Sequence, residues 1–324
     1  VIANDNVNLI VRKGEILSIL GENGSGKTTL MNMLSGIYFP DEGEVYVDGK
    51  EVTIRSPKDS FALGIGMIHQ HFKLINILTA AENIILGLPG KEKLNMKQVE
   101  KEIRELTEQY GFDLNPSQKI YDMSVSQKQT VEIVKVLYRG ADILILDEPT
   151  AVLTPQETEK LFAVLRNMRK AGKSIIIITH KLNEVLELSD RVAVLRKGKY
   201  IDTVETAKAT VESLTEMMVG EKVKLDINRT EPVGAEKRIE MRGITCKNKE
   251  GLKVLTEASF TAYSGEILGV AGISGSGQKE LLESVAGLQP IESGEILYFS
   301  PEGTTEKISE MKAEDIKNLG ITLS

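Results

Sequence analysis

The sequence predicts an α/β protein with a parallel central sheet, and it predicts that this domain begins again later in the chain. A glycine-rich loop, "GENGSGKTT" (21–29), lies between an aliphatic segment and a helical one. Two later aliphatic runs, at 143–146 and 175–178, have no polar alternation, which is typical of strands buried on both faces. The pattern around the loop recurs at a fixed offset, because "GEIL" at 14–17 returns at 265–268.

Composition sets limits on the class of protein. The 324 residues are enough for two ordinary domains. A single cysteine, Cys246, excludes an internal disulfide and favours a reducing compartment. No apolar run approaches the roughly 20 residues of a membrane helix. The formal net charge of −7 argues against a broad nucleic-acid surface.

The loop at 21–28 fits the pattern G-x-x-x-x-G-K-[ST] between a predicted strand (16–20) and a predicted helix (27–36). Glycines allow backbone N–H groups to turn toward phosphate oxygens, and the helix N-terminus adds positive potential. Lys27 has the length to reach the β- and γ-phosphates, and Thr28 offers a hydroxyl to Mg²⁺. A glycine-rich turn without a ligand is the disfavoured alternative. The predicted nucleotide-binding residues here are Gly21, Glu22, Asn23, Gly24, Ser25, Gly26, Lys27, Thr28 and Thr29.

The two aliphatic runs end in residues that suit phosphate chemistry. In "ADILILDEPT" (141–150), Asp147 suits the Mg²⁺ shell and Glu148 suits activation of a water molecule. In "KSIIIITHKL" (173–182), His180 follows the strand and is positioned to contact the γ-phosphate. A helix-capping acid and a structural histidine are the alternatives, which the phosphate loop elsewhere in the chain disfavours.

Gln70 lies in a predicted loop, "MIHQHF" (67–72), and carries no signal by itself. Its neighbours His69 and His71 do not suggest a zinc site, because no cysteine or third close ligand accompanies them.

The repeat predicts three parts: a first domain at 1–220, a polar linker at 221–237 and a second domain at 238–324. The strand-like segment 238–246 would map before residue 1, and "LGITLS" (319–324) corresponds to "LGIGMI" (63–68). We therefore expect a first copy without its initial strand and only the front of a second copy. In the second loop Gln278 and Lys279 replace Lys27 and Thr28, so this copy should bind nucleotide weakly or without turnover.

Together these motifs resemble the ATP-binding cassette (ABC) ATPases. The resemblance rests on the loop, Gln70, "MSVSQ" (123–127), "ILILDEPT", the turn "AVLT" (151–154) and "THK" (179–181). It covers 1–220 and again 238 to 324. It implies a P-loop NTPase cassette: a parallel core sheet with helices, an antiparallel β subdomain and a helical subdomain, followed by a truncated second cassette. Tandem cassettes with a degraded second loop resemble the ATP subunits of bacterial simple-sugar and nucleoside importers.

The resemblance also implies roles for residues that carry no signal alone. Gln70 would join Thr28 and Asp147 around Mg²⁺, and the region 76–135 would face a permease. The "MSVSQ" segment would close over a nucleotide held by the partner cassette, through Ser124, Ser126 and Gln127. Ser126 stands where the family has glycine, and the aromatic residue that usually stacks on adenine is missing.

The function implied is hydrolysis of ATP with Mg²⁺ at the cytoplasmic face of a membrane, coupled to uptake of a nucleoside or simple sugar. Lys27, Glu148 and His180 would be catalytic, at one hydrolysing site beside one weak site. The partners would be permease subunits, a substrate-binding protein reached indirectly and the second cassette of the same chain, with no nucleic acid. Two alternatives stay open: a soluble tandem ATPase acting on ribosomes or DNA, and a nucleotide-gated binding module without turnover.

Overall fold

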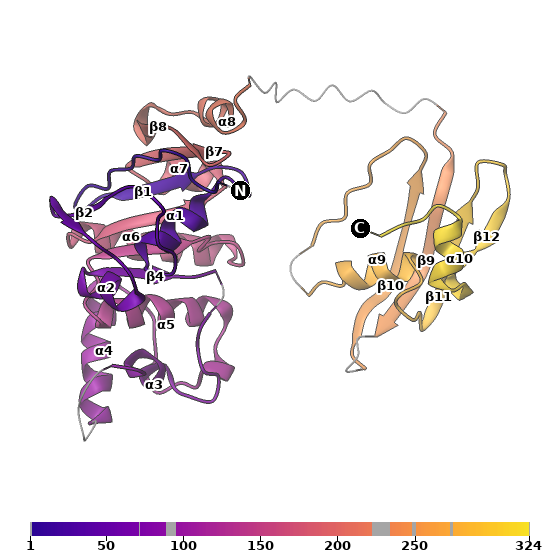
Figure 1. Ribbon diagram of the computed structural model, residues 1–324. Helices are drawn as coiled ribbons and strands as arrows, with labels where there is room; N and C mark the ends of the chain where they lie inside the picture. The colour runs from indigo at the N-terminus through magenta and orange to yellow at the C-terminus, as the bar shows by residue number, and fades with distance from the viewer. Residues whose placement is uncertain are drawn as a thin grey trace. The chain divides into compact units, whose positions relative to one another are not determined.

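The computed structural model describes residues 2–70, 72–88, 95–221, 234–247, 251–272 and 275–323. The chain divides into two compact units, Val1–Leu225 and Asp226–Ser324 (Figure 1). Of the predicted linker at 221–237, residues 222–233 lie outside the described residues.

The first unit is organised around a six-stranded sheet of order β4-β5-β6-β1-β7-β8. All neighbouring strands are parallel except the last pair, β7 and β8. The strands are β1 (Ile16–Leu20), β4 (Ile65–Ile68), β5 (Ile143–Asp147), β6 (Ser174–Thr179), β7 (Arg191–Arg196) and β8 (Lys199–Glu205). The two aliphatic runs predicted as buried strands are β5 and β6, side by side at the centre.

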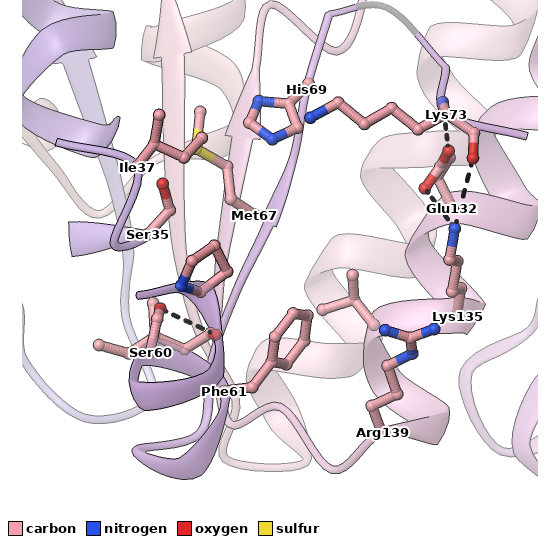
Figure 2. Close-up of a pocket in the computed structure, with 13 residues that line it drawn as sticks. Ser35, Ile37, Ser60, Phe61, Met67, His69, Lys73, Glu132, Lys135 and Arg139 are labelled. Atoms are coloured by element: carbon pink, nitrogen blue, oxygen red, sulfur yellow. Dashed lines mark hydrogen bonds and ion pairs between the residues drawn. The ribbon is translucent and has the colours of Figure 1, made fainter. Parts of the chain in front are cut away.

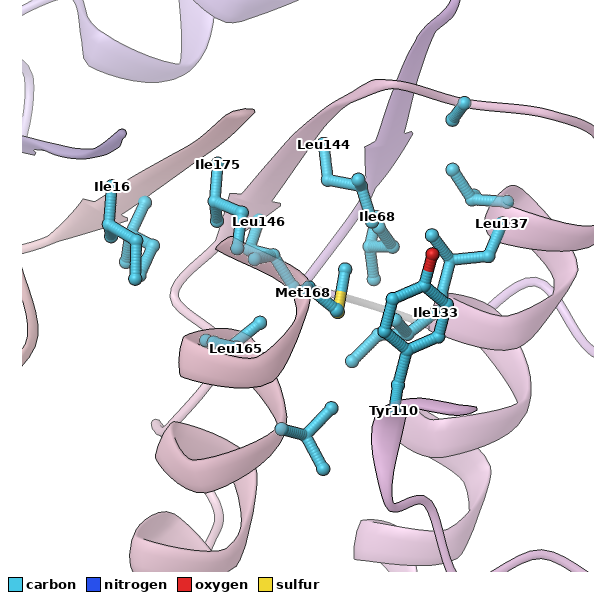
Figure 3. Close-up of a cluster of buried hydrophobic side chains, with 14 of the residues drawn as sticks. Ile16, Ile68, Tyr110, Ile133, Leu137, Leu144, Leu146, Leu165, Met168 and Ile175 are labelled. Carbon is cyan, nitrogen blue, oxygen red and sulfur yellow. The ribbon is translucent and has the colours of Figure 1, made fainter. Parts of the chain in front are cut away.

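Helices cover both faces of this sheet, and each face has its own apolar cluster. On one face, α5 (Val125–Tyr138) and α6 (Pro155–Lys170) supply Ile133, Leu165 and Met168 against Leu144 and Leu146 of β5 (Figure 3). On the other face, Met31 of α1 (Lys27–Leu34) packs with Ile19, Ile145 and Ile176. Because successive strand residues point to opposite faces, the uninterrupted aliphatic runs fill both clusters.

A helical subdomain extends from the first unit. It contains α3 (Ala80–Ile85), α4 (Met96–Tyr110), the 3-10 helix η1 (Ile120–Asp122) and the start of α5, joined by a separate apolar cluster. Thr79 and Glu82 form a capping box at the start of α3, which satisfies backbone N–H groups there.

The remaining elements of the first unit are short. They are the hairpin β2 (Val45–Val47) and β3 (Lys50–Val52), α2 (Pro57–Ala62), α7 (Leu182–Leu188), η2 (Thr206–Lys208) and α8 (Val211–Val219). Within the described ranges, no helix is both long and apolar enough to cross a membrane.

The second unit is built on a four-stranded antiparallel sheet of order β10-β9-β11-β12. Its elements are β9 (Lys237–Lys247), β10 (Lys253–Tyr263), α9 (Gln278–Val285), β11 (Ser293–Phe299), β12 (Thr305–Lys307), η3 (Ile308–Glu310) and α10 (Ala313–Asn318). Cys246 is fully buried in its core, as a small apolar side chain.

The two units share backbone details at the predicted offset. Gly24 and Gly275 have φ of 80° and 82°, and Gly26 and Gly277 have 94° and 87°. Gly26 and Gly277 also cap α1 and α9 from the same left-handed conformation. The order helix, strand, strand, helix is the same in α1-β2-β3-α2 and α9-β11-β12-α10.

One pair of aligned residues, Ile16 and Ile267, differs in burial between the two units. Ile16 of β1 is completely buried between β6 and β7, whereas the aligned Ile267 is 99% exposed and belongs to no strand. The described part of the second unit contains no strands equivalent to β6 and β7.

The packing predicts a stability effect at the α6–sheet contact. Leu165→Ala removes a fully buried side chain and should lower the free energy of unfolding of the first unit by about 2–5 kcal/mol. Urea titration followed by circular dichroism measures this. As control, Ile77→Ala at a 73% exposed position should change it by less than about 0.5 kcal/mol. Equal effects of the two substitutions would contradict this account of the core.

Candidate nucleotide site

The phosphate loop connects the buried end of β1 to the start of α1. Gly26 caps α1 in the left-handed region, with φ of 94°, and a Cβ there would lie 2.4 Å from the carbonyl oxygen of Ala3. A side chain at this position would therefore be strained and would collide with the backbone. The predicted helix is confirmed but ends at Leu34, two residues earlier than expected, with Gly36 at φ of 73° following its cap.

Lys27 is held inside the loop that it follows. Its Nζ atom donates to the carbonyl oxygens of Gly21 at 2.7 Å and Glu22 at 2.8 Å, and the residue is only 6% exposed. Burial lowers the pKa of the Lys27 ammonium, while Glu148 and Asp147 act in the opposite direction. The ammonium group thus sits at the centre of the loop with acidic groups facing it.

Asp147 is the last residue of β5. Burial, followed by the nearby charge of Glu148, raises the pKa of its carboxyl group, and a hydrogen bond with Thr28 and the charge of Lys27 oppose this shift. Asp147 and Thr28 line the same cavity.

Glu148 is held from two sides. Its carboxylate lies 3.0 Å from Nδ1 of His180 and accepts a hydrogen bond of 3.3 Å from Nε2 of Gln70. Its backbone has φ of 46°, an uncommon conformation for a residue with a side chain, which costs about 1–2 kcal/mol. Its N–H donates to the carbonyl oxygen of Ile178 at 2.9 Å, which fixes this turn against β6.

These side chains line one cavity of about 400 Å³, within the range of small-ligand sites. The Ser25 hydroxyl, in the loop, is buried and has no hydrogen-bond partner among the described residues. An unpaired buried hydroxyl is costly unless a ligand or water satisfies it. The lining residues are Asn23, Gly24, Ser25, Gly26, Lys27, Thr28, Thr29, Gln70, Asp147, Glu148 and His180.

The structure thus brings most of the predicted site residues together. Gly21 and Glu22 do not line the cavity, and their carbonyl groups hold Lys27 instead. His71 lies outside the described residues, and the described part of the chain holds no cluster of three His, Cys, Asp or Glu side chains suited to a metal.

The "MSVSQ" residues lie away from this cavity, at the start of α5. Ser124 and Gln127 form a capping box: the Gln127 N–H donates to Oγ of Ser124 at 3.2 Å, and the Ser124 N–H donates to Oε1 of Gln127 at 3.0 Å. Ser126 contributes its carbonyl oxygen to a hydrogen bond from Thr130. Ser124, Ser126 and Gln127 therefore do not belong to the lining of this cavity.

A second cavity lies between the sheet and the helical subdomain (Figure 2). Ile37, which follows α1, Phe61 of α2 and Met67 of β4 face charged residues of α5 across it. Figure 2 shows the Lys73 side chain directed toward His69, and burial followed by the Lys73 charge lowers the pKa of that imidazole. The charged residues that line the cavity are Lys73, Glu132, Lys135 and Arg139.

Sequence analysis missed the residues that support this site. Lys181 donates to the carbonyl oxygen of Thr150 at 3.0 Å and to Glu184 at 2.9 Å, and Gln129 donates to the carbonyl oxygen of Pro149 at 2.7 Å. The sequence could have pointed to Gln129, because this polar residue lies among the apolar positions of the helix at 125–138.

Comparisons with known proteins agree with this geometry. The family model described as "ABC transporter" matches residues 4–151. The CbiO1 structure from Clostridium perfringens, part of the ABC transporter complex CbiONQ, is 30% identical with a TM-score of 0.56 over 64% of this chain and 83% of its own. The chain belongs to the ABC transporter ATP-binding proteins.

Other ABC proteins cover more of the chain. The nucleoside import ATP-binding protein NupA of Lactococcus lactis is 46% identical over 97% of this chain and 63% of its own length. The guanosine import ATP-binding protein NupO of Bacillus subtilis is 47% identical over 91% of this chain and 58% of its own. The chain thus spans about three fifths of the curated relatives it matches. The ADP-bound ABC cassette MJ1267 is 28% identical, with a TM-score of 0.58 over 68% of this chain and 90% of its own.

The position of Lys27 predicts the effect of removing its charge. Lys27→Met should weaken binding of ADP about 10- to 100-fold, the loss expected for one charge-assisted hydrogen bond to phosphate. Titration with a fluorescent ADP analogue measures the dissociation constant. Lys13→Met, at an exposed position before β1, serves as control and should leave the affinity unchanged. Equal affinities of the two variants would show that the cavity is not the nucleotide site.

Proposed function

We propose that this chain binds and hydrolyses ATP to drive import of a nucleoside or simple sugar through a separate permease. The observation that carries the proposal is the convergence of the phosphate loop, Asp147, Glu148, His180 and Gln70 on one cavity. The import role is supported by the similarity to proteins named as nucleoside, guanosine, glucose and ribose import ATP-binding proteins.

Each side chain has a role that its position supports. The loop amides and Lys27 would hold the phosphates, and Glu148, poised between Gln70 and His180, would accept a proton from the attacking water. His180 would orient that carboxylate and contact the γ-phosphate.

Mg²⁺ fits the oxygen atoms offered here. Thr28, Asp147 and Gln70 provide a hydroxyl, a carboxylate and an amide oxygen, the hard donors that Mg²⁺ prefers, and all three line the same cavity. When bound, the ion would neutralise phosphate charge. Asp147 must be ionised for this role, and its raised pKa is still compatible with ionisation because a cation would favour the charged form.

Removal of the proposed base should stop turnover and spare binding. In the full-length protein, Glu148→Gln should lower kcat for ATP hydrolysis by about 100-fold or more, the contribution typical of a general base. Phosphate-release assays measure kcat, and the ADP analogue titration checks that affinity stays within about threefold.

Glu159→Gln, at an exposed position on α6, is the matched control and should behave as wild type. Survival of half the activity in Glu148→Gln would contradict both the base assignment and the presence of a single hydrolysing site.

The chain division supports a tandem arrangement: a first cassette at 1–220, a linker at 221–237 and the front of a second cassette at 238–324. The shared glycine conformations and element order argue for a repeated cassette. In the second copy a neutral amide replaces the ammonium group: Gln278 donates to the carbonyl oxygen of Val270 at 2.9 Å, which aligns with Ile19 and not with the Lys27 acceptors Gly21 and Glu22. We assign weak or non-hydrolytic binding to the site that this loop forms with Ser124, Ser126 and Gln127.

The permease would dock on the second cavity, where the helical subdomain meets the core. Three cations and one acid line it, and the charge balance favours a segment that carries a carboxylate. The burial of apolar residues such as Phe61 beside Arg139, 5.7 Å from the ring centroid to the guanidinium carbon, gives this surface a defined shape. Docking there places the chain at the cytoplasmic face of the membrane, with a substrate-binding protein contacting only the permease.

Affinity purification of the full-length protein from its own cells tests this partner. In mild detergent, mass spectrometry should find a multi-helix permease with the wild type and much less of it with Lys73→Glu, because the surface then carries two cations and two acids and its net positive charge is lost. Lys97→Glu, exposed on α4, is the control. Recovery of ribosomes or DNA-repair proteins without a permease would instead favour the soluble tandem ATPase hypothesis.

A further inference from the structure

Helix α5 carries two buried polar side chains that the proposed chemistry does not use. Gln129 is 5% exposed and Glu132 is 8% exposed, in a helix whose other buried residues are all apolar. They are three positions apart and therefore lie on the same face of the helix, one turn from each other. Buried polar groups are expensive unless each finds a partner, so the partners are informative.

Gln129 reaches the turn that carries Glu148. Its Nε2 atom donates to the carbonyl oxygen of Pro149 at 2.7 Å, in a buried contact between helix α5 and the end of β5. Pro149 directly follows Glu148, whose backbone is in the left-handed region and needs support from its surroundings. Gln129 therefore restrains the Pro149–Thr150 peptide, one residue beyond Glu148, and through it the turn that carries Glu148.

Glu132 reaches the segment that carries Gln70. Its Oε1 atom accepts a hydrogen bond of 2.7 Å from the N–H of Lys73, while Nζ of Lys135 lies 3.5 Å from the carbonyl oxygen of the same residue (Figure 2). On the other side of Gln70, Ile68 pairs with Leu146 in the sheet. Ile68, before Gln70, is thus held by β5, and Lys73, after it, is held by α5.

The contacts of Gln129 and Glu132 both support the two segments that the hydrogen bond between Gln70 and Glu148 joins. Gln70 and Glu148 are 78 residues apart and bond to each other at 3.3 Å, and α5 holds the backbone of Lys73, three residues after Gln70, and of Pro149, one residue after Glu148. A rigid helix that binds both segments sets the distance between them. The same helix begins at Ser124, so the segment expected to contact the second nucleotide and these supports belong to one element.

We propose that Gln129 and Glu132 are positioning residues that keep Glu148 and Gln70 at the separation and orientation that hydrolysis requires. This rests on the proposed function of Glu148 as the base. A displacement of about 1 Å can reduce a rate by about 100-fold, so loss of either support should lower kcat while the phosphate loop, which neither residue touches, keeps its affinity.

The test measures ATP hydrolysis by the full-length protein with its permease. Gln129→Met and Glu132→Met, of similar size without the donor or the acceptor, should each lower kcat about 10- to 100-fold, with KM and ADP affinity within about threefold of wild type. Glu132→Gln keeps an oxygen acceptor for the Lys73 N–H and should restore most of the activity. If Gln129→Met does not fold, Gln129→Leu, a shorter apolar side chain without a donor, replaces it.

A second measurement separates positioning from general stability. Because Glu132 acts through Gln70, Glu132→Met combined with Gln70→Ala should be no slower than Gln70→Ala alone. Asn167→Leu removes a comparable amide-to-carbonyl bond, 3.0 Å to Tyr110, and should lower the melting temperature without changing kcat.

The outcomes distinguish the two proposals. Wild-type kcat in both Gln129→Met and Glu132→Met would overturn the positioning role. So would a kcat in the double variant Glu132→Met with Gln70→Ala that is reduced by the sum of the two single losses in activation free energy. Full activity of Glu148→Gln in the same assay would overturn the proposed function itself, whatever the other variants show.

Discussion

The parallel register of β5, β6 and β1 is the constraint on which the candidate site depends. Asp147 is paired with Ile178, and Leu20 with Thr179, so three strands end at the same edge of the sheet. Residues that follow these ends therefore converge, although Glu148 and His180 are 32 residues apart and the phosphate loop precedes both by more than 100 residues. Ligands of such sheets bind at the carboxyl ends of the strands because the connecting loops and helix N-termini meet there.

Burial gives this edge its electrostatic character. The Lys27 ammonium and the Asp147 carboxyl are both partly removed from water, which disfavours the charged form of each, and each opposes the shift of the other. The low-dielectric surroundings strengthen their interaction with a charged ligand. The same apolar clusters that stabilise the sheet thus prepare the site for phosphates and a cation.

Helix α5 connects parts of the molecule that the sheet does not. Its apolar face packs on β4 and β5 and on the helical subdomain, and its polar residues contact the Gln70 segment and the turn after Glu148. It also forms one wall of the second cavity. A movement of the helical subdomain would consequently act on both the proposed docking surface and the proposed base through one element.

The sequence by itself determined the nucleotide-binding character of the first unit, its central strands and the ABC family, because glycine spacing, unbroken aliphatic runs and the residues that end them are local patterns. It also predicted Lys27, Asp147, Glu148 and His180 as neighbours, since parallel strands end together. Only the tertiary structure decided that Gln129 supports Pro149, that Glu132 supports Lys73, and that Gln70 meets Glu148. These contacts join segments distant in the chain, and no local pattern encodes which buried polar group finds which partner.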